Sequence, residues 1–135
     1  MASQSPRPQS RPLSPHLGIW RWGPHMLVSI LHRMTGAALS FAGLAILVWW
    51  MMAISGGPDA YAGFSQAAKH PLGLFVLIGL TWAFFQHLLS GIRHLVMDSG
   101  AGFELETNKR FAILTLAGSL ILTLLVWIPN LRGLK

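Results

Sequence analysis

Residues 87 to 98 read His87-Leu88-Leu89-Ser90-Gly91-Ile92-Arg93-His94-Leu95-Val96-Met97-Asp98, and they close a long apolar stretch. His87, Gly91 and His94 are spaced by four and then three residues, so on a helix they share one face. Gly91 removes side-chain bulk between the imidazoles, which lets a flat group or another backbone approach closely. A histidine inside a membrane-length apolar segment is costly and usually functional, as a ligand, a proton carrier or a counter-ion. The alternative is a histidine that only bonds to a neighbouring helix.

Three stretches of the chain are long and apolar enough to cross a bilayer. Residues 34–58, 72–92 and 111–128 carry no charge unless His87 is protonated. Each is long enough, or nearly so, to span about 30 Å of hydrocarbon as a helix. With 53% hydrophobic and 10% charged residues, the sequence predicts an all-α integral membrane protein. We expect transmembrane helices over about 26–54, 71–98 and 107–128, within a domain of residues 25–135.

Composition also excludes several kinds of site. The chain has no cysteine, so disulfides, zinc–thiolate sites and iron–sulfur clusters are excluded within it. A net charge of +6 could suggest nucleic acid, but the basic residues fall at the expected helix ends, where they contact anionic lipid or an acidic partner. We therefore expect the lipid bilayer as a partner and no nucleic acid.

The polar segments connect and orient these spans. Residues 1–24 form a tail rich in proline and arginine, followed by an interfacial segment with Trp20 and Trp22 at the headgroup level. Gly56-Gly57-Pro58 ends the first helix, a connection leads to Pro71, and Pro129 stops the third helix. Seven Lys and Arg residues fall on the N-terminal side and three on the other. The N-terminus should therefore be cytoplasmic, or matrix-facing in an organelle.

The start of helix one brings a second polar face into the same leaflet as the end of helix two. Ser29, His32, Arg33 and Gly36 share a face by the same three-and-four spacing. The two faces can meet near the positively charged surface. His87 lies six residues from Arg93, about 9 Å deeper at 1.5 Å per residue.

These positions predict a deep imidazole, His87, below a shallow cluster of Arg33, His32, Arg93 and His94. This arrangement suits a b-type haem, because the iron binds a neutral imidazole and the propionates bind cations nearer the interface. Each arginine could instead extend to lipid phosphate without any ligand.

The same spacing limits the iron ligands that this chain can provide. His94 is about 10 Å along the axis from His87, so the two cannot bind opposite faces of one iron. His32 is expected to lie too shallow, and helix three carries no histidine. A six-coordinate haem would take its second ligand from another chain. Helix three is interpreted as packing surface.

Ser29 and Arg33 are one helical turn apart near the membrane surface. A hydroxyl and a guanidinium could hold the polar head of a quinone. A serine in a membrane helix more often bonds its own backbone or packs closely. Asp98 could supply protons, although a solvated acid at a helix end is the simpler interpretation.

Three motifs, in order along the chain, resemble a known family. They are Arg11-Pro12-Leu13-Ser14-Pro15-His16-Leu17, Ser29-Ile30-Leu31-His32-Arg33-Met34-Thr35-Gly36 and the segment from His87 to Asp98. Together they resemble the cytochrome b membrane-anchor subunit of succinate dehydrogenase (respiratory complex II). The resemblance implies that a flavoprotein subunit oxidises succinate and an iron–sulfur subunit carries the electrons. This chain and a second membrane-anchor subunit would hold both on the membrane, complete a helical bundle and form the site of ubiquinone reduction, with no catalysis by this chain alone.

The resemblance also implies roles for individual residues. His87 would be an axial ligand of one haem b, with the other ligand from the partner anchor. Ser29 and Arg33 match quinone-site residues, and His32 and Arg33 match residues near the haem propionates. His94 is carried over as a propionate or structural contact.

Other readings of the same residues remain open. They are the anchor of a fumarate reductase, a membrane scaffold without haem, and proton conduction through His87. Conduction ranks last because the first helix offers only Thr35, Ser40 and, at its far end, Ser55 as polar residues between Met34 and Pro58. The short tail before Arg11 favours a bacterial inner membrane over the mitochondrial inner membrane.

Overall fold

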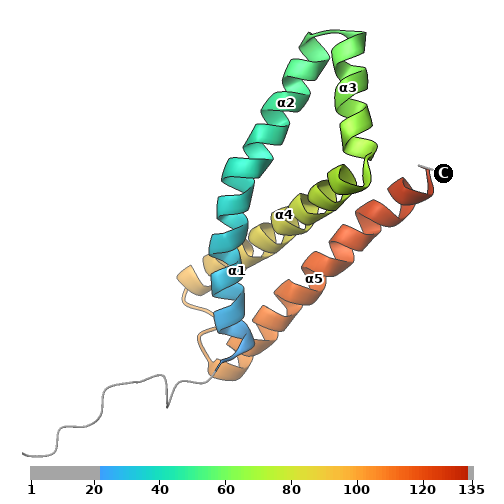
Figure 1. Cartoon of the computed structure of the whole chain (residues 1–135). Helices are drawn as coiled ribbons and strands as arrows, with labels where there is room; N and C mark the ends of the chain where they lie inside the picture. The colour runs from blue at the N-terminus through green and yellow to red at the C-terminus, as the bar shows by residue number, and fades with distance from the viewer. Residues whose placement is uncertain (1–21, 134–135) are drawn as a thin grey trace, which may run out of the picture.

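A computed structural model describes residues 22–133, and apart from short connections this part of the chain is helical (Figure 1). The elements, in order, are α1 (Pro24–Ala38), the π-helical turn η1 (Leu39–Gly43), α2 (Leu44–Ser55), α3 (Pro58–Lys69), α4 (Pro71–Asp98) and α5 (Leu105–Arg132). The prediction of an all-α protein is confirmed. The first predicted motif, Trp20 and most of the N-terminal tail lie outside the described residues.

Within residues 22–133, three helices are long and apolar enough to cross a membrane, as predicted. They are the continuous helix Pro24–Ser55, formed by α1, η1 and α2, and the helices α4 and α5. α4 and α5 run side by side and α1 packs against both, whereas α2 leans away from them and contacts α3 (Figure 1). The end of the molecule that carries α1 is therefore a three-helix bundle.

The bundle has a small and unusually polar interior. In the described part, the buried apolar residues are Val28, Ala53, Ala83 and Ala112. Seven polar residues are buried as well: Thr35, Gln86, Ser90, Arg93, Thr115, Ser119 and Thr123. Large apolar side chains point outward, as expected where lipid or another membrane helix covers them. Completion of the bundle by a second subunit remains a prediction.

Two boundaries differ from the sequence expectation. The connection after Pro58 is itself a helix, α3, which has proline at its first position, Asp59 in its first turn and Lys69 in its last. These residues suit the helix ends and the helix dipole. Helix α5 continues past Pro129 to Arg132, so the prediction that Pro129 stops it was wrong. A proline this close to the helix end removes one backbone hydrogen bond and leaves the last turn closed by Gly133 N–H and Pro129 O, 3.2 Å apart.

The turn between α3 and α4 depends on a glycine. A Cβ on Gly73 would collide with the backbone oxygen of Ala67, and backbone cannot move aside as a side chain can. We expect Gly73→Ala to destabilise the protein by about 1–3 kcal/mol, as overpacking does. Gly63→Ala is the control, because a Cβ there meets nothing within 4 Å. Thermal unfolding of the purified complex measures both, and equal midpoints would contradict the expected collision.

Candidate functional site

Three histidines meet where α1 and α4 pack together. The ring of His32, on α1, stacks on the ring of His87, on α4, with ring centroids 4.0 Å apart and an interplanar angle of 6°. The His32 ring also contacts the ring of His94, with centroids 5.1 Å apart and a tilt of 59°. All three side chains are partly buried. Three of the five predicted site residues therefore form one cluster.

The hydrogen bonds of His87 determine which of its nitrogens carries the proton. His87 Nδ1 lies 3.1 Å from the backbone oxygen of His32. The hydroxyl of Thr35, about one turn further along α1, is 3.4 Å from the same nitrogen. A carbonyl oxygen can only accept, so Nδ1 must donate its hydrogen. Thr35 Oγ1 donates to the Leu31 oxygen at 2.7 Å, which leaves its lone pairs free to accept from Nδ1. Nε2 of a neutral His87 is then the unprotonated nitrogen that can bind a metal.

Gly36 makes room for this imidazole. A Cβ on Gly36 would lie 2.9 Å from His87 Cε1 and 3.4 Å from His87 Nδ1. Gly91, which the sequence singled out for close approach, is less constrained, because a Cβ there would lie 3.9 Å from His32 Cε1. The tightest point of the site is therefore on α1 and not on α4.

Two features of the predicted arrangement were wrong. His32 and His87 do not lie in separate shallow and deep layers, because their ring centroids are 4.0 Å apart. Arg93 does not join the histidines, because its guanidinium donates to Asn108 Oδ1 on α5. Arg93 precedes His94 by one residue, or about 100° around the helix, and so faces the other neighbour. Helix α5 therefore contributes a polar contact that the sequence interpretation did not assign.

The two remaining predicted residues lie on α1 beside the cluster. Ser29 is partly buried and Arg33 is exposed. Among residues 22–133, the ion pair is between Lys109 and Glu106, so Arg33 has no acidic partner there. Its guanidinium is accessible to lipid, to a partner chain or to an anionic ligand.

Residues 7–126 match the family model for the succinate dehydrogenase/fumarate reductase transmembrane subunit. The chain belongs to this family. Among its relatives in the family, the succinate dehydrogenase cytochrome b556 subunit of Paracoccus denitrificans is 40% identical over 119 residues, which cover 88% of this chain and 91% of the relative. The corresponding subunit of Rickettsia felis is 38% identical over 118 residues, 87% of this chain and 91% of the relative. The family resemblance inferred from the motifs is confirmed.

A mitochondrial relative matches less of its own length. The succinate dehydrogenase cytochrome b560 subunit of Sus scrofa is 33% identical over 109 residues, which cover 79% of this chain and 64% of the relative. The family match and the three apolar helices identify a multi-pass membrane subunit of the succinate dehydrogenase/fumarate reductase type.

In this transmembrane subunit, sequence reasoning missed a residue next to the site. Gln86 is fully buried, and Ser119 Oγ on α5 hydrogen-bonds to its Oε1 at 2.8 Å. An amide in an apolar segment, directly before His87, was a visible signal. Ser119 and Thr123, one turn apart on α5, were an equally visible pair of small polar residues.

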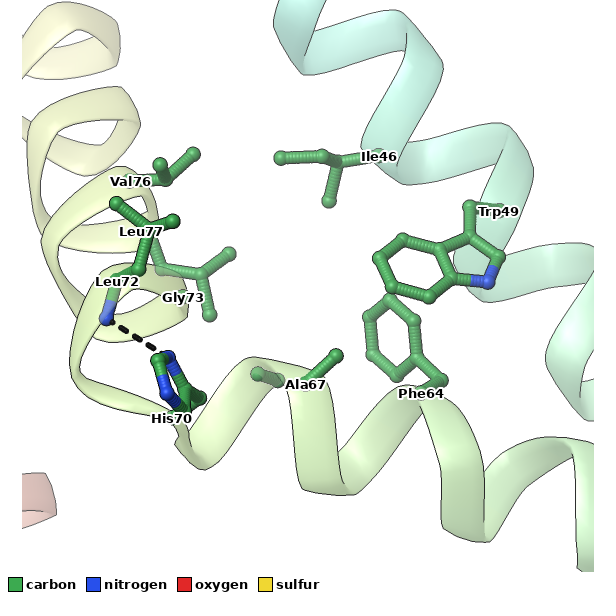
Figure 2. Close-up of a pocket in the computed structure, with 10 residues that line it drawn as sticks. Ile46, Trp49, Phe64, Ala67, His70, Leu72, Gly73, Val76 and Leu77 are labelled. Carbon is green, nitrogen blue, oxygen red and sulfur yellow. Dashed lines mark hydrogen bonds between the residues drawn. The ribbon is translucent and has the colours of Figure 1, made fainter.

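An apolar pocket lies away from the histidines, between α2, α3 and α4 (Figure 2). It has a volume of about 330 Å³ and is lined by Ile46, Trp49, Phe64, Ala67, Ala68, His70, Leu72, Gly73, Val76 and Leu77. Leu77 is ten residues before His87, or about 15 Å along α4. The pocket is therefore separate from the histidine cluster.

Proposed function

We propose that this chain is the membrane-anchor cytochrome b subunit of a succinate:quinone oxidoreductase. It has no catalysis of its own, binds one haem b whose iron is shared with a second membrane-anchor subunit, and contributes to the ubiquinone-reduction site. It tethers the flavoprotein and iron–sulfur subunits to a bacterial inner membrane, with its N-terminus cytoplasmic. The two bacterial relatives reported above are both named succinate dehydrogenase cytochrome b556 subunits, and these names support the assignment.

The observation that carries the proposal is the hydrogen bond from His87 Nδ1–H to the His32 oxygen. A metal-ligating histidine characteristically donates its second ring N–H to a carbonyl or carboxylate, which fixes the tautomer and the ring direction. His87 therefore has the donor chemistry of an axial haem ligand through Nε2. The haem, when bound, supplies one-electron transfer.

The other residues of the cluster have supporting roles in this proposal. His32 holds the His87 ring by its backbone oxygen and by stacking, and so excludes water from one face of it. The parallel stack does not place two ring nitrogens on opposite sides of one metal, so His32 is not the second ligand. His32, His94 and Arg33 bind the propionates as donors and cations.

A difference spectrum tests the proposal. The chain is produced with the products of its neighbouring genes, and membranes are compared after dithionite reduction and after oxidation. We expect the Soret and alpha bands of a b-type haem in the assembled complex. A complex that contains this chain and oxidises succinate but shows no such bands would make it a scaffold without haem. A complex that preferentially reduces fumarate would support the fumarate reductase anchor.

The quinone part of the proposal rests on Ser29 and Arg33. We expect Arg33→Leu to lower kcat/KM for ubiquinone by roughly 10–100-fold, because it removes a hydrogen bond from a charged group to the quinone head, worth about 1.5–3 kcal/mol. Ser29→Ala removes a neutral hydrogen bond, worth about 0.5–1.5 kcal/mol, and should lower kcat/KM by roughly 2–10-fold. Electron transfer from succinate to a water-soluble dye should be unchanged, since it bypasses the membrane domain. Equal losses with both acceptors would show an assembly defect in place of a quinone contact.

A further inference from the structure

Helix α4 presents two polar stripes to two different neighbours. Gln86, Ser90 and Arg93 are spaced by four and three residues and are all buried. Gln86 and Arg93 hydrogen-bond to side chains of α5. The stripe of His87, Gly91 and His94 is offset by one residue, or about 100° around the helix, and its histidines contact α1. A rotation of α4 about its own axis would therefore move both its α5 contacts and the direction of the His87 side chain.

The bond between Gln86 and Ser119 is the most buried of these contacts. Both side chains have no exposed surface, and the two oxygens are 2.8 Å apart. Ser119 Oγ also lies 2.9 Å from the Leu116 oxygen, and its single hydrogen cannot serve both acceptors fully. Turning the Gln86 amide over would let its NH₂ donate to Ser119 while Ser119 donates to Leu116. In either orientation the bond joins α4 to α5.

Apolar packing alone defines the rotation of α4 weakly. Most of the buried apolar residues of the described part are alanines, which fit many rotational settings, whereas a hydrogen bond is directional. A ring nitrogen about 5–6 Å from the helix axis moves about 1 Å for a 10° rotation. That displacement is enough to break the 3.1 Å bond between His87 Nδ1 and the His32 oxygen.

We propose that the buried Gln86–Ser119 pair is a positioning device that sets the rotation of α4 and thereby the direction of His87 toward the haem iron. This inference rests on the proposed function, because it takes His87 as the axial ligand. Gln86 and Ser119 act through His87 and do not contact the haem.

The test compares Ser119→Ala and Gln86→Leu with Thr123→Ala in the purified complex. Thr123 is the matched control, because it is buried on the same helix one turn away and its hydroxyl bonds only its own backbone, at the Ser119 oxygen. The readouts are the electron paramagnetic resonance g-values of the oxidised haem and its midpoint potential. We expect both single variants to shift these values and Thr123→Ala to leave them as in the wild type. The double variant should shift them no further than either single variant, because one bond is lost in all three.

Several results would overturn the positioning role. These are wild-type g-values and potential in both single variants, a shift in Thr123→Ala of the same size, or additive shifts in the double variant. Failure of both single variants to assemble, while Thr123→Ala assembles, would assign the pair to bundle stability alone. His87→Leu is measured alongside, because a haem signal that survives it would refute the proposed ligand independently of the Gln86–Ser119 result.

Discussion

We expect His87→Leu to remove the b-type haem signal from an otherwise assembled complex. Leucine fills much of the space of the imidazole but offers no lone pair to iron. Removing an outer partner of a metal ligand typically lowers affinity by about 10–100-fold, and removing the ligand itself should lower it further. The reduced-minus-oxidised spectrum of the purified complex measures the loss. The spectrum is normalised to the protein concentration of each sample.

The control for this variant is His70→Asn. His70 is an exposed histidine at the start of the same helix, where its Nδ1 accepts from Leu72 N–H at 3.3 Å. Asparagine keeps a capping acceptor, so the haem signal should stay at the wild-type level. An unchanged signal in His87→Leu would move the ligand to another residue and refute the tautomer argument.

Gly36→Ala is expected to reduce haem binding without replacing any ligand. The added Cβ would lie 2.9 Å from His87 Cε1, so the ring must shift away from α1. The ring is held there by its bond to the His32 oxygen, and the shift breaks that bond. We expect haem affinity to fall by about 10–100-fold and the unfolding free energy by about 1–3 kcal/mol. Haem titration of the purified complex, with its thermal midpoint, checks both effects.

Gly79→Ala provides the matched comparison for this substitution. Gly79 is an exposed glycine within α4, and a Cβ there meets nothing within 4 Å. Its haem content should equal that of the wild type, and alanine should favour the helix by up to about 1 kcal/mol. Equal haem binding in both glycine variants would mean that the space opposite His87 is not needed by the ligand.

The spacing of polar residues predicted the faces of the helices well. His87 and His94 share a face because four-and-three spacing is intrinsic to the α-helix, and the structure places both against His32. The absence of charge over the three stretches predicted the three spans for a similarly local reason. The resemblance to the family was found in the same way, because each of its motifs is a short continuous stretch of sequence.

Relative depth could not be predicted in this way. The level of His32 against His87 depends on how α1 and α4 cross, and no residue count within one helix contains that crossing. Arg93 was placed in the histidine cluster because of its expected depth in the membrane. Its position around the helix decides its contacts instead, and it faces Asn108 on α5. The sequence interpretation treated Pro129 as a helix stop, but a proline in the last turn is tolerated where few backbone bonds remain to be lost.

The π-helical turn η1 changes how the first span meets its surroundings. A π turn contains one more residue than an α turn, so the side chains after Gly43 are advanced by about one position relative to those before Leu39. The side chains of α2 are therefore rotated around the helix axis relative to the positions that an unbroken α-helix would give them after α1. The side of α1 that carries His32 and Gly36 faces protein. Counting on from these residues by threes and fours does not lead to the same side of α2, because the π turn adds a residue. One continuous helix can in this way pack against two different sets of neighbours, α4 and α5 along α1 and α3 along α2.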